Sequence, residues 1–265
     1  MSAMSPVTPD RDGTPILGCH VDALSWTGTL DLIVKWARRR ESRYVCICNV
    51  HSVVTARRDP DFQAVLTSAD AALPDGMPLA WYLRRHGFKD QQRINGPDLL
   101  ARLSARAASL GLPVFFIGST AAILARMTAR LRCSQPALDI VGTLSPPFRS
   151  LTPRENESIA AEIQRSGARI VFVGLGCPKQ ERWMAEQRGR IPAVMIGVGA
   201  AFDFHAGQQP RAPRWMRDHG LEWLHRLRCE PRRLWRRYLV TNSLFAWYLL
   251  RELFAARAWA SSVRD

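Results

Sequence analysis

The fold of this chain is decided by one stretch in its second half, Arg169-Ile-Val-Phe-Val-Gly-Leu-Gly-Cys-Pro-Lys-Gln-Glu181. The consecutive apolar residues from Ile170 to Val173 predict a strand that is covered on both faces, as strands of parallel sheets are. The glycines and polar residues behind it predict a tight turn into a helix. Because ligands of parallel sheets bind beyond the carboxyl ends of the strands, functional residues are expected directly after such strands.

Similar apolar runs recur along the chain, with helical periodicity between them. These runs cover residues 44–50, 69–73, 113–118, 138–142 and 193–199. Strands that alternate with helices predict an α/β fold, here a Rossmann-like parallel sheet flanked by helices. Cys46 and Cys48 alternate within the first run, so we expect both on one face of a strand, as small hydrophobic residues.

The composition changes after Gly207. Residues 208–265 hold 12 arginines against five acidic residues, a net charge of +7 out of +14 for the 265 residues, and five of the nine tryptophans. No strand-like run remains there, so a helical C-terminal appendage is expected. Interleaved Arg and Trp suit an anionic membrane surface. The alternative is a helical pair that packs its tryptophans on the core and leaves its arginines in solvent.

The predicted organisation therefore has three parts. Residues 1–14 form a flexible N-terminus, and residues 15–207 form a Rossmann-like catalytic domain. Residues 208–265 form a basic, Trp-rich helical appendage that associates with a membrane. The longest apolar run, residues 238–250, is too short to span a bilayer.

Several common function classes leave no signature in the sequence. No P-loop, G-x-S-x-G or H-E-x-x-H motif occurs. The basic charge is compatible with nucleic-acid binding, but 34 of the 37 basic residues are arginines and no RNA- or DNA-binding motif accompanies them. Gly197-Val-Gly199 matches part of a dinucleotide fingerprint, yet no later strand carries a ribose-binding acid. A nucleic-acid-binding protein and a Rossmann-type nucleotide-binding protein stay open as alternatives.

No metal site and no cofactor are expected. The six cysteines include no C-x-x-C pair, and no histidines cluster at zinc-ligand spacing. Such scattered cysteines fit a reducing cytoplasm. Asp59-Pro60-Asp61 matches the D-x-D motif with which many sugar transferases hold a metal–nucleotide complex. It stands between two helical stretches, so we expect Asp59 to cap a helix instead.

Nine short motifs, in register over roughly residues 15–240, carry a resemblance to a known family. They are Cys48-Asn-Val-His51, Leu73-Pro-Asp-Gly76, Arg93-Ile-Asn-Gly-Pro-Asp-Leu99, Val173-Gly-Leu-Gly-Cys-Pro-Lys-Gln-Glu181, Gly197-Val-Gly-Ala-Ala-Phe-Asp203, Ala206-Gly207, Arg211-Ala-Pro213, Gly220-Leu-Glu-Trp-Leu224 and Glu230-Pro-Arg-Arg233. In this order the chain resembles the WecG/TagA/CpsF glycosyltransferases (glycosyltransferase family 26), which build bacterial surface polysaccharides. The His after Asn49 and the Cys-rich run are more similar to the exopolysaccharide branch, such as the xanthan glucosyltransferase.

The resemblance implies a metal-independent, inverting transfer of a hexosyl or N-acetylhexosaminyl group. The donor would be a UDP-sugar and the acceptor a saccharide on a polyprenyl diphosphate. It also implies a cytoplasmic protein that is peripherally associated with the inner membrane. Such a transfer needs a base for the acceptor hydroxyl and positive charge for the departing diphosphate.

Asp75 is the predicted catalytic base. It follows a predicted strand, Gly76 would let the backbone turn beside a ligand, and the family pattern has its essential Asp here. On local chemistry alone, Pro-Asp-Gly is a turn whose Asp caps backbone groups. His51 is a second candidate base, although a lone His after a strand is more often a hydrogen-bonded structural residue.

The predicted donor-binding residues follow the other strands. Asn49 could hydrogen-bond sugar hydroxyls, but an Asx turn explains it equally well. Ile47 stands where the family has Thr, which puts a hydroxyl contact in doubt. The predicted set comprises Asn49, His51, Gly76, Arg93 for the donor phosphates, Gly174 and Gly176 for a glycine-lined turn, Lys179 for a phosphate, and Gln180 for the uracil or ribose.

The appendage supplies the remaining candidates. Arg226, Arg232, Arg233 and Arg236 are predicted to bind the leaving diphosphate, because a guanidinium can offer two hydrogen bonds to phosphate oxygens. We expect the appendage to dock on the membrane and fold over the site. An exposed Trp-rich appendage could equally serve a subunit interface, so a homo-oligomer stays open.

Overall fold

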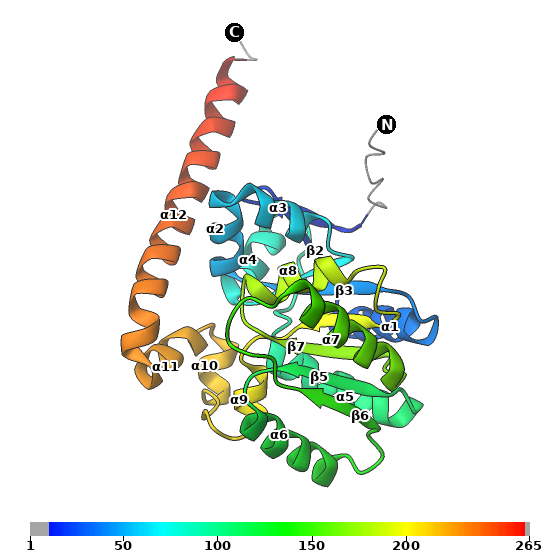
Figure 1. The fold of residues 1–265 in the computed structure, drawn as a ribbon. Coiled ribbons are helices and arrows are strands. Elements are labelled where there is room, and N and C mark those ends of the chain that lie inside the picture. The colour runs from blue at the N-terminus through cyan, green and yellow to red at the C-terminus, as the bar shows by residue number, and fades with distance from the viewer. Residues whose placement is uncertain (1–10, 263–265) are drawn as a thin grey trace, which may run out of the picture.

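A computed structural model describes the backbone of residues 11–262 (Figure 1), while the side chains of Arg214, Asp218, Arg233 and residues 253–262 lie outside the description. Of the N-terminal segment that is expected to be flexible, residues 1–10 lie outside the described residues. Its remainder enters the first strand, β1 (Gly13–Ile16), which pairs with β2 (Cys19–Asp22) in an antiparallel hairpin. Neither strand of this hairpin was predicted from the sequence.

The main sheet has six strands, all parallel, in the order β4-β3-β8-β7-β5-β6. The strands are β3 (Arg43–Cys48), β4 (Ala71–Pro74), β5 (Val114–Gly118), β6 (Ile140–Leu144), β7 (Ile170–Gly174) and β8 (Val194–Gly197). Each one lies within or overlaps a run predicted from the sequence. The predicted α/β class, a Rossmann-like sheet flanked by helices with a helical C-terminal appendage, is confirmed.

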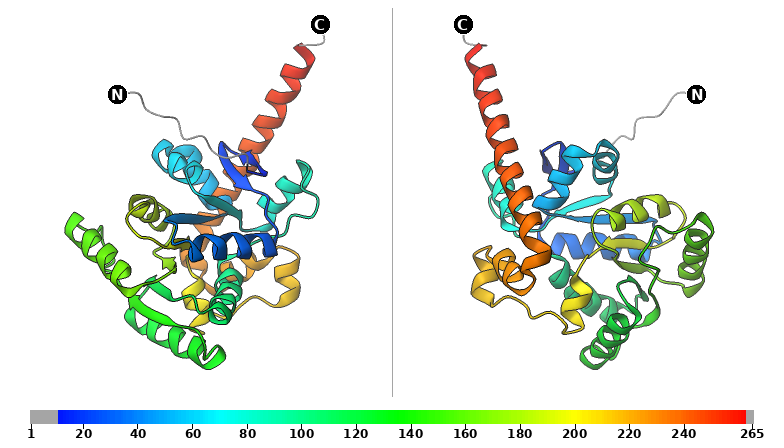
Figure 2. Two further views of the ribbon diagram at one scale, coloured as in Figure 1. Left: turned by 90° about the vertical axis from the view of Figure 1, so that its right-hand side faces the viewer. Right: turned by 60° about the vertical axis from the view of Figure 1, so that its left-hand side comes forward.

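Helices cover both faces of the sheet (Figures 1 and 2). They enclose two buried hydrophobic clusters, one on each face. One face is covered by α1 (Trp26–Arg38), α5 (Gly96–Leu110), α6 (Ala121–Ser134) and α9 (Ala201–His205). The other is covered by α2 (Val50–Arg58), α3 (Pro60–Thr67), α4 (Met77–Arg85), α7 (Pro153–Ser166) and α8 (Lys179–Gln187). Burial of both faces explains the unbroken apolar runs.

Alternation along β3 distributes its side chains between the two clusters. Val45 and Ile47 belong to the cluster with α1 and α5, whereas Cys46 and Cys48 belong to the cluster with α2 and α8. The expectation that the two cysteines share one face is therefore confirmed. All six cysteines are free. Asp59 accepts a hydrogen bond from the backbone N–H of Phe62 at 3.0 Å and caps α3, as expected.

The C-terminal appendage is helical and consists of α10 (Arg214–Asp218), α11 (Glu222–Cys229) and the long α12 (Pro231–Ser262). In both further views α12 runs past the body of the protein alongside α2 and extends beyond it (Figure 2). Leu234, Thr241 and Phe245 form its buried face. No helix within residues 11–262 has the length and apolar character that a membrane crossing needs.

The carboxyl ends of β5 and β7 approach each other so closely that both strands end in glycine. Gly118 has φ +124°, and a Cβ there would lie 2.4 Å from the carbonyl oxygen of Gly174. A Cβ on Gly174 would lie 2.7 Å from the ring of Phe202 in α9. Backbone contact at these strand ends therefore requires residues without side chains.

We predict that Gly118→Ala lowers the free energy of unfolding by about 2 kcal/mol or more, since it adds a backbone clash to a positive φ. Gly87→Ala is the matched control, because Gly87 has φ +106° and no atom within 4 Å of the added Cβ. Urea unfolding of both variants isolates the clash. Equal losses in the two variants would contradict the close approach of β5 and β7.

Candidate functional site

Asp75 lies directly after β4, at the carboxyl edge of the sheet. Its backbone N–H donates to the carbonyl oxygen of Cys48 at the end of β3, at 2.6 Å. Gly76 follows with φ +94°, a conformation that L residues rarely adopt, and begins α4 as its N-cap. The strand end and the glycine turn hold Asp75 half-buried at the rim of the sheet.

Arg93 is brought to Asp75 by the loop before α5. The backbone N–H of Ile94 donates to the carbonyl oxygen of Pro74 at 2.8 Å, next to Asp75. Asn95 caps α5, and Gly96 lies so close to β8 that a Cβ would stand 2.6 Å from the carbonyl oxygen of Val198. The carboxyl ends of β4 and β8, which lie on either side of β3, thus determine where the loop places Arg93.

The appendage closes over the same turn. Gly220 has φ +73° and contacts the first residue of α4 so closely that a Cβ would lie 2.5 Å from the side chain of Met77. The helix α11 begins two residues later, and its Glu222 forms an ion pair with Arg93 at 2.8 Å. Arg226, one turn further along α11, lies half-buried near Asp75, with its guanidinium 5.7 Å from the ring centre of Phe204.

These neighbours set the protonation of Asp75. The pKa of its carboxyl is raised to about 6, because burial and the charge of Glu222 raise it by more than Arg93 and Arg226 lower it. For Arg93, burial disfavours the charged form, but Asp75 and Glu222 keep its pKa above the ordinary value. A carboxylate with a pKa near 6 is a stronger base than an exposed aspartate, yet it is mostly ionised at neutral pH.

Two further arginines lie beside Asp98, a residue whose charge also acts on Arg93. Asp98 in α5 pairs with Arg211 at 2.8 Å and lies 4.0 Å from Arg217. Among the described residues, buried N–H groups of Arg211, Arg217 and Arg226 have no hydrogen-bond partner. Buried donors without partners are costly, which is typical of a site that an anionic ligand completes.

The arrangement around Asp75 can be assigned to a class of protein by comparison with known protein families. The family model described as "Glycosyl transferase WecG/TagA/CpsF family" matches residues 14–258. The chain belongs to this family. It is therefore a glycosyltransferase of surface-polysaccharide synthesis, and the predicted resemblance is confirmed at the level of the family.

The turn after β7 was predicted to hold the nucleotide. In this glycosyltransferase the turn is hydrogen-bonded to a side chain of the protein itself, that of Gln180. The Gln180 side chain is buried, and its Oε1 accepts from the backbone N–H groups of Gly176 at 3.2 Å and Gly199 at 3.1 Å. Its Nε2 donates to Glu181 at 2.8 Å. Gln180 thus joins the turns after β7 and β8, whereas Lys179 is exposed at the start of α8.

Asn49 and His51 lie in the turn that opens α2. The Oδ1 atom of Asn49 accepts from the backbone N–H of Ser52 at 3.2 Å, so the side chain caps the helix, as the local alternative supposed. The Nδ1 atom of His51 is buried without a hydrogen-bond partner among the described residues. Burial and the charge of Arg237 lower the pKa of His51 to about 4, so its imidazole is neutral at pH 7.

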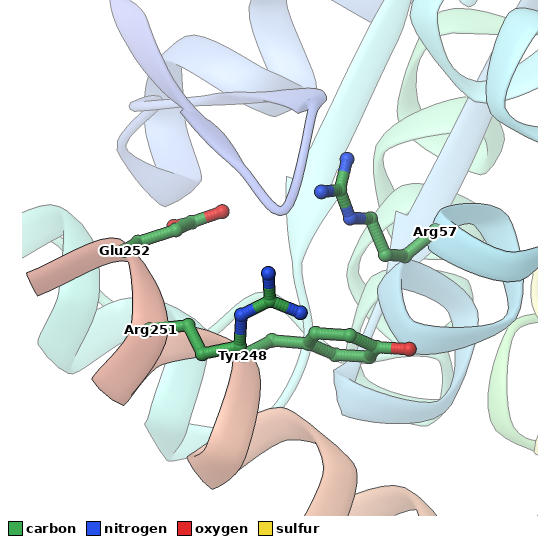
Figure 3. Close-up of a pocket in the computed structure, with 4 residues that line it drawn as sticks. All are labelled: Arg57, Tyr248, Arg251 and Glu252. Atoms are coloured by element: carbon green, nitrogen blue, oxygen red, sulfur yellow. The ribbon is translucent and has the colours of Figure 1, made fainter. Parts of the chain in front are cut away.

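Two grooves lie between α2 and α12. The larger, of about 490 Å³, is lined by His51, Val54, Thr55, Arg58, Asp59, Arg237, Val240, Thr241 and Leu244. The smaller, of about 180 Å³, is shown in Figure 3, where Arg57 of α2 faces Tyr248, Arg251 and Glu252 of α12. Neither groove is lined by Asp75, so the base candidate lies outside both.

The predicted appendage arginines divide into separate groups. Arg226 lies near Asp75, whereas Arg232 and Arg236 are exposed on α12, and the Arg236 guanidinium lies 5.5 Å from the ring centre of Trp235. The side chain of Arg233 lies outside the described residues. Within the described part of the chain, no group of three or more His, Cys, Asp or Glu side chains could hold a metal ion.

Sequence reasoning missed Glu222 and Arg237. Glu222 lies inside the quoted motif Gly220-Leu-Glu-Trp-Leu224, but nothing in a single sequence pairs it with Arg93, 129 positions earlier. Arg237 directly follows the predicted Arg236, and helical geometry turns the two side chains by about 100°, so that one faces solvent and the other the groove.

We predict that Gln180→Leu lowers the free energy of unfolding by about 2–4 kcal/mol, because it removes the buried acceptor of two half-buried N–H groups, those of Gly176 and Gly199. Its neighbour Lys179, which is exposed, provides the control: Lys179→Leu should change stability by less than about 0.5 kcal/mol. Chemical denaturation measures both. A Gln180→Leu protein as stable as the wild type would show that the two turns do not depend on this amide.

Proposed function

We propose that this glycosyltransferase moves a hexosyl or N-acetylhexosaminyl group from a UDP-sugar to a saccharide carried on a polyprenyl diphosphate. The observation that carries the proposal is one carboxylate with a raised pKa, Asp75, beside two arginines, Arg93 and Arg226, the second of which has a buried N–H without a partner among the described residues. An inverting transfer needs this pair of features, one base and one cationic site for a diphosphate. Family membership favours this class over a nucleic-acid-binding protein or a dinucleotide-dependent enzyme.

In the proposed reaction the Asp75 carboxylate accepts the proton of the acceptor hydroxyl. The hydroxyl oxygen bonds to the anomeric carbon as the bond from that carbon to the UDP oxygen breaks on the opposite face, so the configuration inverts. The charge that develops on the departing UDP is stabilised by Arg93 and Arg226. Guanidinium groups supply this stabilisation without a metal ion, since they remain charged throughout the accessible pH range.

Peripheral attachment to the inner face of the cytoplasmic membrane forms part of the proposal. Trp215, Trp223, Trp235 and Trp247 of the appendage are between 41% and 59% exposed, although α12 buries another face against the body. Such exposure supports a membrane role over the alternative in which the tryptophans pack on the core. Indole rings favour the headgroup region, and arginines beside them meet lipid phosphates.

We predict that Asp75→Asn lowers the rate of acceptor-dependent UDP release by about 10²–10⁴-fold, the usual contribution of a general base. In the wild type, kcat/KM should fall about tenfold per pH unit below pH 6, since only ionised Asp75 accepts the proton. The assay uses purified protein, a panel of UDP-sugars and a polyprenyl-diphosphate sugar in detergent, with and without EDTA.

Thermal unfolding provides the control for Asp75→Asn. A raised pKa means that the folded protein holds this proton more tightly than the unfolded chain, so ionisation of Asp75 costs stability as the pH rises towards 6. The variant should therefore have an unchanged or higher Tm at pH 7. UDP release that survives in the folded variant would move the base elsewhere, with His51 the first alternative.

We also predict that Trp235→Ser combined with Trp247→Ser weakens binding to anionic phospholipid vesicles about tenfold or more. Phe148→Ser is the control, because Phe148 is 78% exposed but lies on the catalytic body between β6 and α7. Sedimentation with vesicles measures the bound fraction. If the double variant binds like the wild type, the appendage tryptophans do not dock on lipid.

A further inference from the structure

Glu222 stands out among the charged residues near Asp75, because its position works against anion binding. It is the first residue of α11 and belongs to the appendage, yet it reaches the catalytic body. The close approach of Gly220 to Met77 holds the start of α11 against the turn that carries Asp75. Glu222 therefore adds a negative charge to a site whose arginines are suited to bind a negative ligand.

The partner of Glu222 is the guanidinium expected to bind the donor. Arg93 and Glu222 are joined at 2.8 Å, and their side chains are only 12% and 15% exposed. Solvent therefore screens this pair less than a surface pair. A carboxylate and a phosphate offer a guanidinium the same chemistry, two negatively charged oxygens at similar separation. One guanidinium face cannot bind both with full strength, so the two acceptors compete.

Other arginines would keep the site attractive for the donor while Glu222 occupies Arg93. Arg226 lies one turn along the same helix and has a buried Nε–H without a partner among the described residues. Arg211 and Arg217 are partly neutralised by Asp98. Displacement of Glu222 by a diphosphate would leave its carboxylate free to reach solvent or another cation, and it would release the appendage from Arg93.

We propose that Glu222 is a built-in occupant of the donor-phosphate site, and that the diphosphate of the donor displaces it from Arg93. This proposal rests on the proposed function. It makes Glu222 a positioning residue that holds Arg93 and α11 in place while the site is empty. It couples arrival of the donor to the seating of the appendage, because breaking the ion pair removes one of the contacts that hold α11 on the body.

Equilibrium binding of UDP and of uridine to the full-length protein tests this proposal. Glu222→Gln removes the competing charge and should tighten UDP binding about tenfold, while uridine, which lacks the diphosphate, should bind as before. Glu222→Asp retains the charge and should bind UDP within about twofold of the wild type. Asp31→Asn, which removes a carboxylate paired with Arg106 at 3.3 Å on the surface, controls for net charge and should change nothing.

The outcomes distinguish a role of Glu222 in donor binding from a purely structural role. Unchanged or weaker UDP binding by a folded Glu222→Gln protein would overturn the proposal. Glu222 would then only hold the appendage on the body. A parallel gain for uridine would also overturn it, since the effect would then not act on the diphosphate. If the wild type binds no UDP, the proposed function itself fails, and this inference falls with it. Thermal unfolding of each variant verifies that it is folded.

Discussion

A half-buried carboxylate, Asp75, is the constraint on which the rest of the site depends. Removing it from water raises its pKa, and the nearby Arg93 and Arg226 lower the pKa and so favour the ionised form. Neither guanidinium comes from the strand that carries Asp75. One is supplied by the loop before α5 and the other by the C-terminal appendage, so the proposed chemistry requires two remote segments to converge on one strand end.

The sheet makes this convergence possible by packing backbone against backbone at its carboxyl edge. Gly118, Gly174 and Gly96 each contact another chain segment at a distance that a Cβ would not allow. Gln180 then joins the turns after β7 and β8 through two backbone N–H groups. Glycine contacts and a buried amide leave little freedom at this edge, and functional side chains on such a rigid support keep their geometry without a ligand.

Much of this architecture could be read from the sequence, because strands covered on both faces leave unbroken apolar runs. All six strands of the main sheet were predicted in this way, and Asp59 was predicted as a helix cap from its place between two helical stretches. The hairpin β1–β2 was not predicted, because its strands have only four residues each and contain polar as well as apolar residues. Asp75 and Arg93 were identified through a family resemblance, and local chemistry alone favoured a simple turn for Asp75.

The remaining residues of the site could not be predicted, because their roles arise from contacts across the chain. Glu222 reaches Arg93 only because Gly220 packs against Met77 and holds α11 against the body. Arg237 is distinguished from Arg236 only by the direction in which its side chain points. The appendage is therefore more than a basic surface. One face of α12 is buried against α2 and another exposes tryptophans, while α11 places both a carboxylate and a guanidinium beside the proposed base. The appendage thus places charged groups beside Asp75 and also exposes aromatic side chains. Any force that moves the appendage at a surface must therefore alter the charges around Asp75.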